Sequence, residues 1–129
     1  MGAVERLREL GAGREILGEI GPREKDGLLV SHRNADLTPE GRRAAPAVFR
    51  ALLAGQLLYG LGERKSARIL KAVRGALEME PGLKVEAVDV VEAGSLRTVE
   101  KINGSAILIA AAWAGSTLLA DSVLLEATR

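Results

Sequence analysis

The chain contains no cysteine and only one histidine. The lack of cysteine excludes disulfides, thiolate metal sites and a cysteine nucleophile, and it is compatible with a reducing cytoplasm. A single histidine excludes a histidine-rich metal centre and any motif that needs two imidazoles. Whatever chemistry this chain performs alone therefore uses few catalytic groups.

Aromatic side chains, long apolar runs and an excess of one charge are also scarce. Aromatics make up 2% of the 129 residues, and 18 Lys and Arg face 17 Asp and Glu, for a net charge of +1. No apolar segment approaches the roughly 20 residues that span a bilayer. The basic residues interleave with acidic ones and lack aromatic neighbours for base stacking. We therefore expect one cytoplasmic domain that binds no nucleic acid and no membrane, and whose ligand site is local.

The amino-terminal part shows short elements separated by glycines. Apolar residues at helical spacing predict a helix over residues 3–10, and the apolar tract 15–20 predicts a strand. The charged, breaker-rich tract 21–27 is typical of a hinge or linker. Residues 28–30 are expected to add a short strand before the next loop.

The rest of the chain predicts helices followed by strands. Thr38 as N-cap and Pro39 at the first helical position open a helix that should run to about Tyr59. A second amphipathic helix is expected over 65–79. Strands are predicted over 85–91, 106–113 and 117–125, and the short turn 114–116 implies antiparallel pairing. The predicted class is α+β: a small antiparallel sheet of about three strands, covered on one face by two main helices and preceded by a short helix–strand remnant.

One loop concentrates groups that hold anions. Its sequence is Asp26-Gly27-Leu28-Leu29-Val30-Ser31-His32-Arg33-Asn34, and Leu37-Thr38-Pro39-Glu40 follows it. It places backbone donors, a hydroxyl and a guanidinium just ahead of a helix start, which is typical of a polyanion site. The alternative is a solvated turn, in which Ser31 stabilises the backbone and His32 is an ordinary loop residue. Gly11-Ala12-Gly13 is not a dinucleotide motif, because a third glycine and a preceding strand are missing.

This loop resembles the phosphate loop of the pantothenate synthetase (pantoate–β-alanine ligase) family. Further segments resemble the family in the same order along the chain. They are Glu15-Ile16-Leu17-Gly18, Arg23-Glu24-Lys25-Asp26-Gly27-Leu28, Ala45-Pro46, Arg50-Ala51-Leu52, Gly62-Glu63-Arg64, Pro81-Gly82-Leu83-Lys84-Val85-Glu86, and Ile107 through Asp121. Any one segment is weak, but their colinearity identifies the chain as similar to the carboxy-terminal part of that family.

The resemblance implies a division of labour. Residues 1–22 would be the end of the family's nucleotide-binding domain plus the hinge, and residues 23–129 the carboxy-terminal domain that covers ATP. The amino-terminal domain of the same ligase is the implied partner. It carries a PTMGxLHxGH motif, which a chain with one histidine cannot contain, and it would hold most of the ATP with Mg²⁺. By this resemblance the chain alone is expected to bind ATP weakly and to lack ligase activity.

The resemblance also assigns roles to five residues. Ser31 would donate its hydroxyl to a phosphate oxygen, Arg33 would present its guanidinium to the triphosphate, and backbone N–H groups from Val30 to Arg33 would form an anion nest. His32 stands where the family has a second serine. Pro22 stands where the family has a valine whose main chain faces adenine, and proline has no N–H to donate.

These departures leave a second interpretation open. Together with the altered segment 118–122, they fit a noncatalytic interaction module that kept the fold and lost the nucleotide. A strand over 15–20 without its parent sheet would also expose an unpaired edge, so a homodimer through that segment is predicted.

Overall fold

The computed structural model of the chain describes residues 2–18 and 21–126. Its centre is a three-stranded antiparallel sheet with the order β1-β2-β3, formed by β1 (Lys84–Glu92), β2 (Ala106–Ala114) and β3 (Thr117–Leu125). Ala114 pairs with Thr117 across a two-residue turn in which Gly115 has a φ of 63°. A short turn with positive φ suits a hairpin whose strands twist, and the predicted three strands are confirmed.

Both faces of the central strand are apolar, which explains why the sequence of β2 is an uninterrupted hydrophobic run. Alternate residues belong to two separate hydrophobic clusters. One face carries Ala106, Leu108, Ala110, Ala112 and Ala114, and the other carries Ile107, Ile109, Ala111 and Trp113. Because successive strand side chains point to opposite faces, this sheet has to be covered on both sides.

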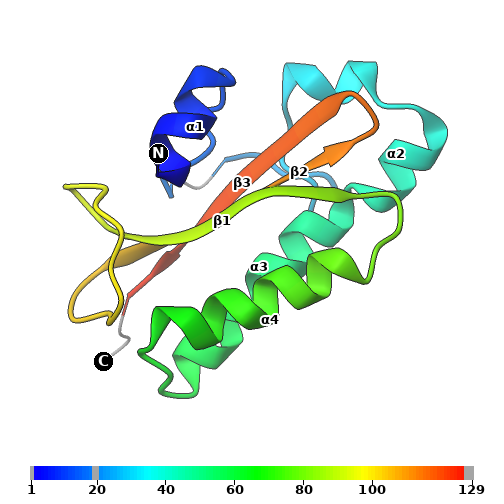
Figure 1. Cartoon of the computed structure of the whole chain (residues 1–129). Coiled ribbons are helices and arrows are strands. Elements are labelled where there is room, and N and C mark those ends of the chain that lie inside the picture. The colour runs from blue at the N-terminus through cyan, green and yellow to red at the C-terminus, as the bar shows by residue number, and fades with distance from the viewer. Residues whose placement is uncertain (1, 19–20, 127–129) are drawn as a thin grey trace.

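Two helices cover the first face. They are α3 (Pro46–Gly60) and α4 (Ser66–Glu78), which lie side by side below the sheet in Figure 1 and bury Leu52, Ile69 and Val73 against it. The prediction of two main helices on one face is thereby confirmed.

The single helix predicted from Pro39 to Tyr59 is wrong, because the structure splits it into α2 (Pro39–Ala44) and α3. The physical reason is Pro46, which has no N–H to donate to the preceding turn and whose ring crowds it. The predicted start holds, since the Thr38 hydroxyl accepts a hydrogen bond from the Gly41 N–H at 3.0 Å. α2 therefore leads into α3 at a bend instead of continuing it.

The amino-terminal segment covers the second face. Helix α1 (Ala3–Glu9) lies on the opposite side of the sheet from α3 and α4, and Val4, Leu7, Ala12 and Ile16 pack there against Ile107 and Ile109. The strand predicted over 15–20 is wrong for residues 15–18, which form turns; residues 19 and 20 lie outside the described residues. The Glu15 carbonyl and the Gly18 N–H bond a serine side chain in place of a neighbouring strand.

The short strand expected at 28–30 is likewise reduced, to a single bridge between Leu29 and Arg23. Across the described residues, no helix combines the length and the apolar character that a bilayer crossing requires.

Close packing between α3, α4 and the sheet depends on Gly55. A Cβ at Gly55 would lie 2.6 Å from Leu108 Cδ2 and 2.7 Å from Val73 Cγ2, so a methyl group does not fit without movement. We predict that Gly55→Ala lowers the free energy of unfolding by about 1–3 kcal/mol through overpacking. Gly75→Ala on the open face of α4, where a Cβ meets nothing within 4 Å, should raise it by up to about 1 kcal/mol. Urea unfolding of both variants tests the pair, and equal effects would contradict it.

Asp89 is a carboxylate buried in β1. Its side chain accepts hydrogen bonds from the Thr98 hydroxyl and the Val90 N–H, each at 2.8 Å, so it has the partners that a buried acid needs. Burial nevertheless raises the pKa of Asp89 above its usual value, against the lowering effect of those two hydrogen bonds, and nearby Glu5 adds to the rise.

This raised pKa gives a stability prediction with a definite sign. Below the ordinary pKa, Asp89 is neutral in both the folded and unfolded states; above the folded pKa, the folded state holds a buried charge. Wild type should therefore lose stability relative to Asp89→Asn as pH rises through that window. The test is the difference in unfolding free energy between the two proteins from acid to neutral pH. A difference that is flat, or that shifts toward wild type with rising pH, would refute the prediction.

Candidate functional site

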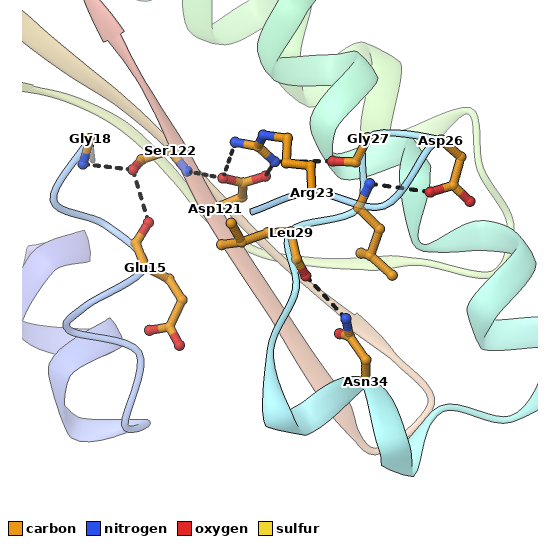
Figure 2. Close-up of polar contacts among 10 residues, drawn as sticks. Glu15, Gly18, Arg23, Asp26, Gly27, Leu29, Asn34, Asp121 and Ser122 are labelled. Atoms are coloured by element: carbon orange, nitrogen blue, oxygen red, sulfur yellow. Dashed lines mark hydrogen bonds and ion pairs between the residues drawn. The ribbon is translucent and has the colours of Figure 1, made fainter. Parts of the chain in front are cut away.

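Two consecutive residues of β3 hold the chain on both sides of the sheet. Asp121 accepts two hydrogen bonds from the guanidinium of Arg23, at 2.5 and 2.9 Å, while Ser122 points to the other face. Figure 2 shows Asp121 directed toward Arg23, and Ser122 directed toward Glu15 and Gly18. Gly18 and Arg23 are therefore held from opposite faces of β3.

Arg23 is fixed by more than its carboxylate partner. It also donates to the Gly27 carbonyl at 3.0 Å, and its guanidinium lies 4.0 Å from the centre of the Phe49 ring. A planar guanidinium suits both a bidentate carboxylate and an aromatic face. Arg23 thus ties the loop to β3 and to α3 at once.

The tract that follows is a closed loop with its own hydrogen bonds. The Glu24 N–H donates to the Leu28 carbonyl at 2.8 Å, and the Val30 N–H donates to the Pro22 carbonyl at 2.9 Å. Gly27 has a φ of 93°, and a Cβ there would lie 2.3 Å from Phe49 Cδ2, so only glycine fits this turn. Residues 22–30 are consequently held as one unit.

Ser122 holds the amino-terminal side in the same way. Its hydroxyl accepts from the Gly18 N–H at 2.9 Å and donates to the Glu15 carbonyl at 2.8 Å. Together, Asp121 and Ser122 bring residues 22–30 and residues 15–18 close to each other.

A cleft of about 380 Å³ lies where these segments meet. Its lining residues are Arg14, Glu15, Gly21, Pro22, Leu29, Val30, Ser31, His32 and Asp121. Four of the five predicted site residues are thus brought together. Val30, with 47% of its surface exposed, and His32 are open to solvent.

Ser31 begins a short 3₁₀ helix, η1 (His32–Asp36), where the sequence predicted a loop. Its hydroxyl oxygen accepts the Arg33 N–H at 3.2 Å, which is the turn-stabilising role weighed from the sequence. Since the Val30 N–H also has an acceptor, two of the four backbone donors of the expected nest are occupied. Within the described residues, the N–H groups of Ser31 and His32 have no acceptor.

The Arg33 side chain has partners of its own. Its Nη1 donates to Glu15 Oε1 at 2.7 Å, and its Nη2 donates to the Gly11 carbonyl. Its side chain does not line the cleft, but it contacts Glu15, which does.

Sequence reasoning did not assign Arg14, Glu15, Arg23 or Asp121 to the site. For Asp121 a signal was present, since a lone carboxylate in the apolar run 117–125 needs a cation, and Arg23 stands in the charged tract. For Arg14 and Glu15 no local signal existed, because their place in the cleft depends on the turn held by Ser122.

Known proteins resemble this chain along most of its length. Residues 5–124 match the family described as pantoate-beta-alanine ligase. The chain belongs to this family. Pantothenate synthetase from Moorella thermoacetica is 39% identical over 120 residues, which cover 93% of this chain and 42% of the relative. The enzyme from Carboxydothermus hydrogenoformans is 37% identical over 124 residues, which cover 95% and 44%.

The fold is found in a solved structure of the family as well. The crystal structure of pantothenate synthetase from Thermus thermophilus superposes with a TM-score of 0.78 at 32% identity, over 95% of this chain and 44% of that one. The chain thus spans less than half the length of these relatives. It corresponds to the carboxy-terminal portion of the family.

Residues 2–18 and 21–126 contain no group of three or more acidic or histidine side chains that could hold a metal ion.

The Arg23–Asp121 pair should dominate the stability of the loop. The side chains are 22% and 6% exposed, so Asp121→Asn leaves a guanidinium unpaired in a largely buried place. We predict a loss of about 3 kcal/mol in the free energy of unfolding, together with faster hydrogen exchange over residues 22–30. Asp26→Asn is the matched control, because Asp26 pairs with Arg42 on the surface, where ion pairs contribute little. Comparable losses in the two variants would count against this role.

Proposed function

We propose that this chain is the ATP-covering part of a pantoate–β-alanine ligase. The observation that carries the proposal is the single cleft in which Pro22, Val30, Ser31 and His32 meet. In this role the chain contacts the phosphates of ATP and closes the active site. It supplies binding and water exclusion, and the remainder of the ligase supplies the substrate pockets.

The chemistry of such a ligase explains why a cover is useful. The carboxylate of pantoate attacks the α-phosphorus of ATP to give an acyl adenylate and pyrophosphate, and the amine of β-alanine then displaces AMP. Both steps need neutralisation of phosphate charge and exclusion of water more than an elaborate general base. The N–H groups of Ser31 and His32, the imidazole of His32 and the guanidinium groups of Arg14 and Arg33 are the donors that this chain would direct at a phosphate.

The proposed partner is the amino-terminal nucleotide-binding domain of the same ligase. Support comes from length, since the relatives are more than twice as long as the segment they share with this chain. That domain would hold ATP with Mg²⁺, and the cleft at residues 14–15, 21–22 and 29–32 would face it. Domain closure of this kind assembles a site only when the nucleotide is present.

The second candidate function is a noncatalytic interaction module, which two observations favour. Pro22 offers no N–H, and its carbonyl is taken by Val30; the charge of Arg33 is neutralised by Glu15. If the chain is a noncatalytic interaction module, MgATP does not bind to it. The homodimer predicted through 15–20 is expected under this second hypothesis and stays a prediction. Residues 15–18 form turns and therefore provide no free strand edge for such a dimer. Light scattering at high protein concentration tests whether the homodimer forms.

Titration calorimetry with MgATP separates the two candidates. We predict weak but saturable binding to wild type, and a roughly tenfold loss for Arg33→Ala, since a hydrogen bond to a charged group contributes about 1.5 kcal/mol. Arg74→Ala on the exposed face of α4 is the matched control and should bind as wild type does. Amide signals of Ser31 and His32 should shift on binding. Unchanged affinity in Arg33→Ala would remove Arg33 from the role, and no binding to wild type would favour the interaction module.

A further inference from the structure

The ion pair between Glu15 and Arg33 joins the two walls of the site. Glu15 comes from the amino-terminal turn, and Arg33 comes from η1, directly after the cleft-lining residues 29–32. Nη1 and Oε1 are 2.7 Å apart, and each side chain is only 16% exposed. At that depth the pair is screened less than a surface ion pair.

The pair is incomplete on the carboxylate side. Glu15 Oε2 is buried and has no hydrogen-bond partner among the described residues, while the second guanidinium nitrogen bonds the neutral Gly11 carbonyl. Arg33 therefore does not form the two-bond fork with Glu15 that Arg23 forms with Asp121. A buried carboxylate oxygen without a hydrogen-bond partner calls for an explanation.

The position of Glu15 matters for a polyanion. Glu15 lines the cleft, so its negative charge lies close to any phosphate that enters. The other carboxylate of the cleft, Asp121, is already satisfied by Arg23. Glu15 thus both repels an anionic ligand and occupies a guanidinium beside it.

We propose that Glu15 is an internal competitor for Arg33, which a polyphosphate entering the cleft displaces from the guanidinium. The inference rests on the proposed function, whose site it concerns. Phosphate and carboxylate oxygens match the guanidinium equally well, so Arg33 exchanges one anionic partner for another and stays paired. The released Glu15 carboxylate returns to water. Glu15 is accordingly an affinity-determining residue of the cleft, and it weakens polyanion binding by the chain alone.

Calorimetry with inorganic tripolyphosphate tests the exchange without relying on adenine or on ligase activity. Glu15→Gln, which keeps the side-chain shape, should bind tripolyphosphate about fivefold more tightly than wild type, the factor that a unit charge about 4 Å away contributes in water. Glu78→Gln on the exposed face of α4 makes the same change in net charge far from the cleft and should leave the affinity unchanged. Far-UV circular dichroism and the unfolding midpoint confirm that each variant is folded.

A double-variant cycle separates exchange from simple charge removal. In an Arg33→Gln background, Glu15→Gln should give a smaller gain, because only the repulsion by Glu15 is removed and there is no guanidinium to release. A full fivefold gain in that background would overturn the exchange, as would unchanged or weaker binding by Glu15→Gln alone.

The same titrations with MgATP keep this inference distinct from the proposed function. If tripolyphosphate shows the gain and ATP binds no better than tripolyphosphate, the nucleotide role fails and the exchange stands. If ATP binds wild type and Glu15→Gln shows no gain, the exchange fails and the nucleotide role stands. Absence of binding by every variant overturns both.

Discussion

The bidentate contact between Arg23 and Asp121 is the interaction on which the site depends. It fixes residues 22–30 to the edge strand, and the adjacent Ser122 fixes residues 15–18 from the opposite face. Because successive strand residues point in opposite directions, two neighbouring side chains are enough to set both walls of the cleft. A rigid strand is a more accurate support for such walls than a free loop would be.

The central strand imposes a second constraint, because it is apolar on both faces. Ile107 and Ile109 would face water if α1 and the following turn were removed, so the amino-terminal segment shares a core with the sheet. A boundary drawn at residue 22 from sequence resemblance therefore separates two segments that pack on the same three strands. The cleft lies between these two segments, so a movement of one relative to the other would change the shape of the cleft.

Features with local signals could be predicted from the sequence, and features that depend on distant partners could not. The Thr38 cap, the three strands and the pairing of the last two follow from spacing and turn residues. The break at Pro46 was missed because the apolar period continues through it. The turn at 15–18 depends on Ser122, which is 104 residues from Gly18. The contact between Arg33 and Glu15 likewise forms only in the folded chain, and no local sequence pattern predicts it. Four of the five residues assigned by resemblance line one cleft, but the resemblance carried no information on their hydrogen-bond partners.

The charges around the cleft favour a cover over a self-sufficient binding site. Arg23 is committed to Asp121, and Arg33 to Glu15, so within the described residues Arg14 is the cleft-lining arginine without an ion-pair partner. A triphosphate brings more negative charge than the Arg14 guanidinium, the His32 imidazole and two backbone N–H groups can balance while Arg33 stays paired with Glu15. In the proposed role, most of its binding free energy would come from another surface, and this chain would add to it only after the nucleotide is in place. Weak binding by the chain alone is therefore the behaviour that closure over a bound nucleotide requires, since a cover that bound ATP tightly by itself would compete with the domain it is meant to close upon.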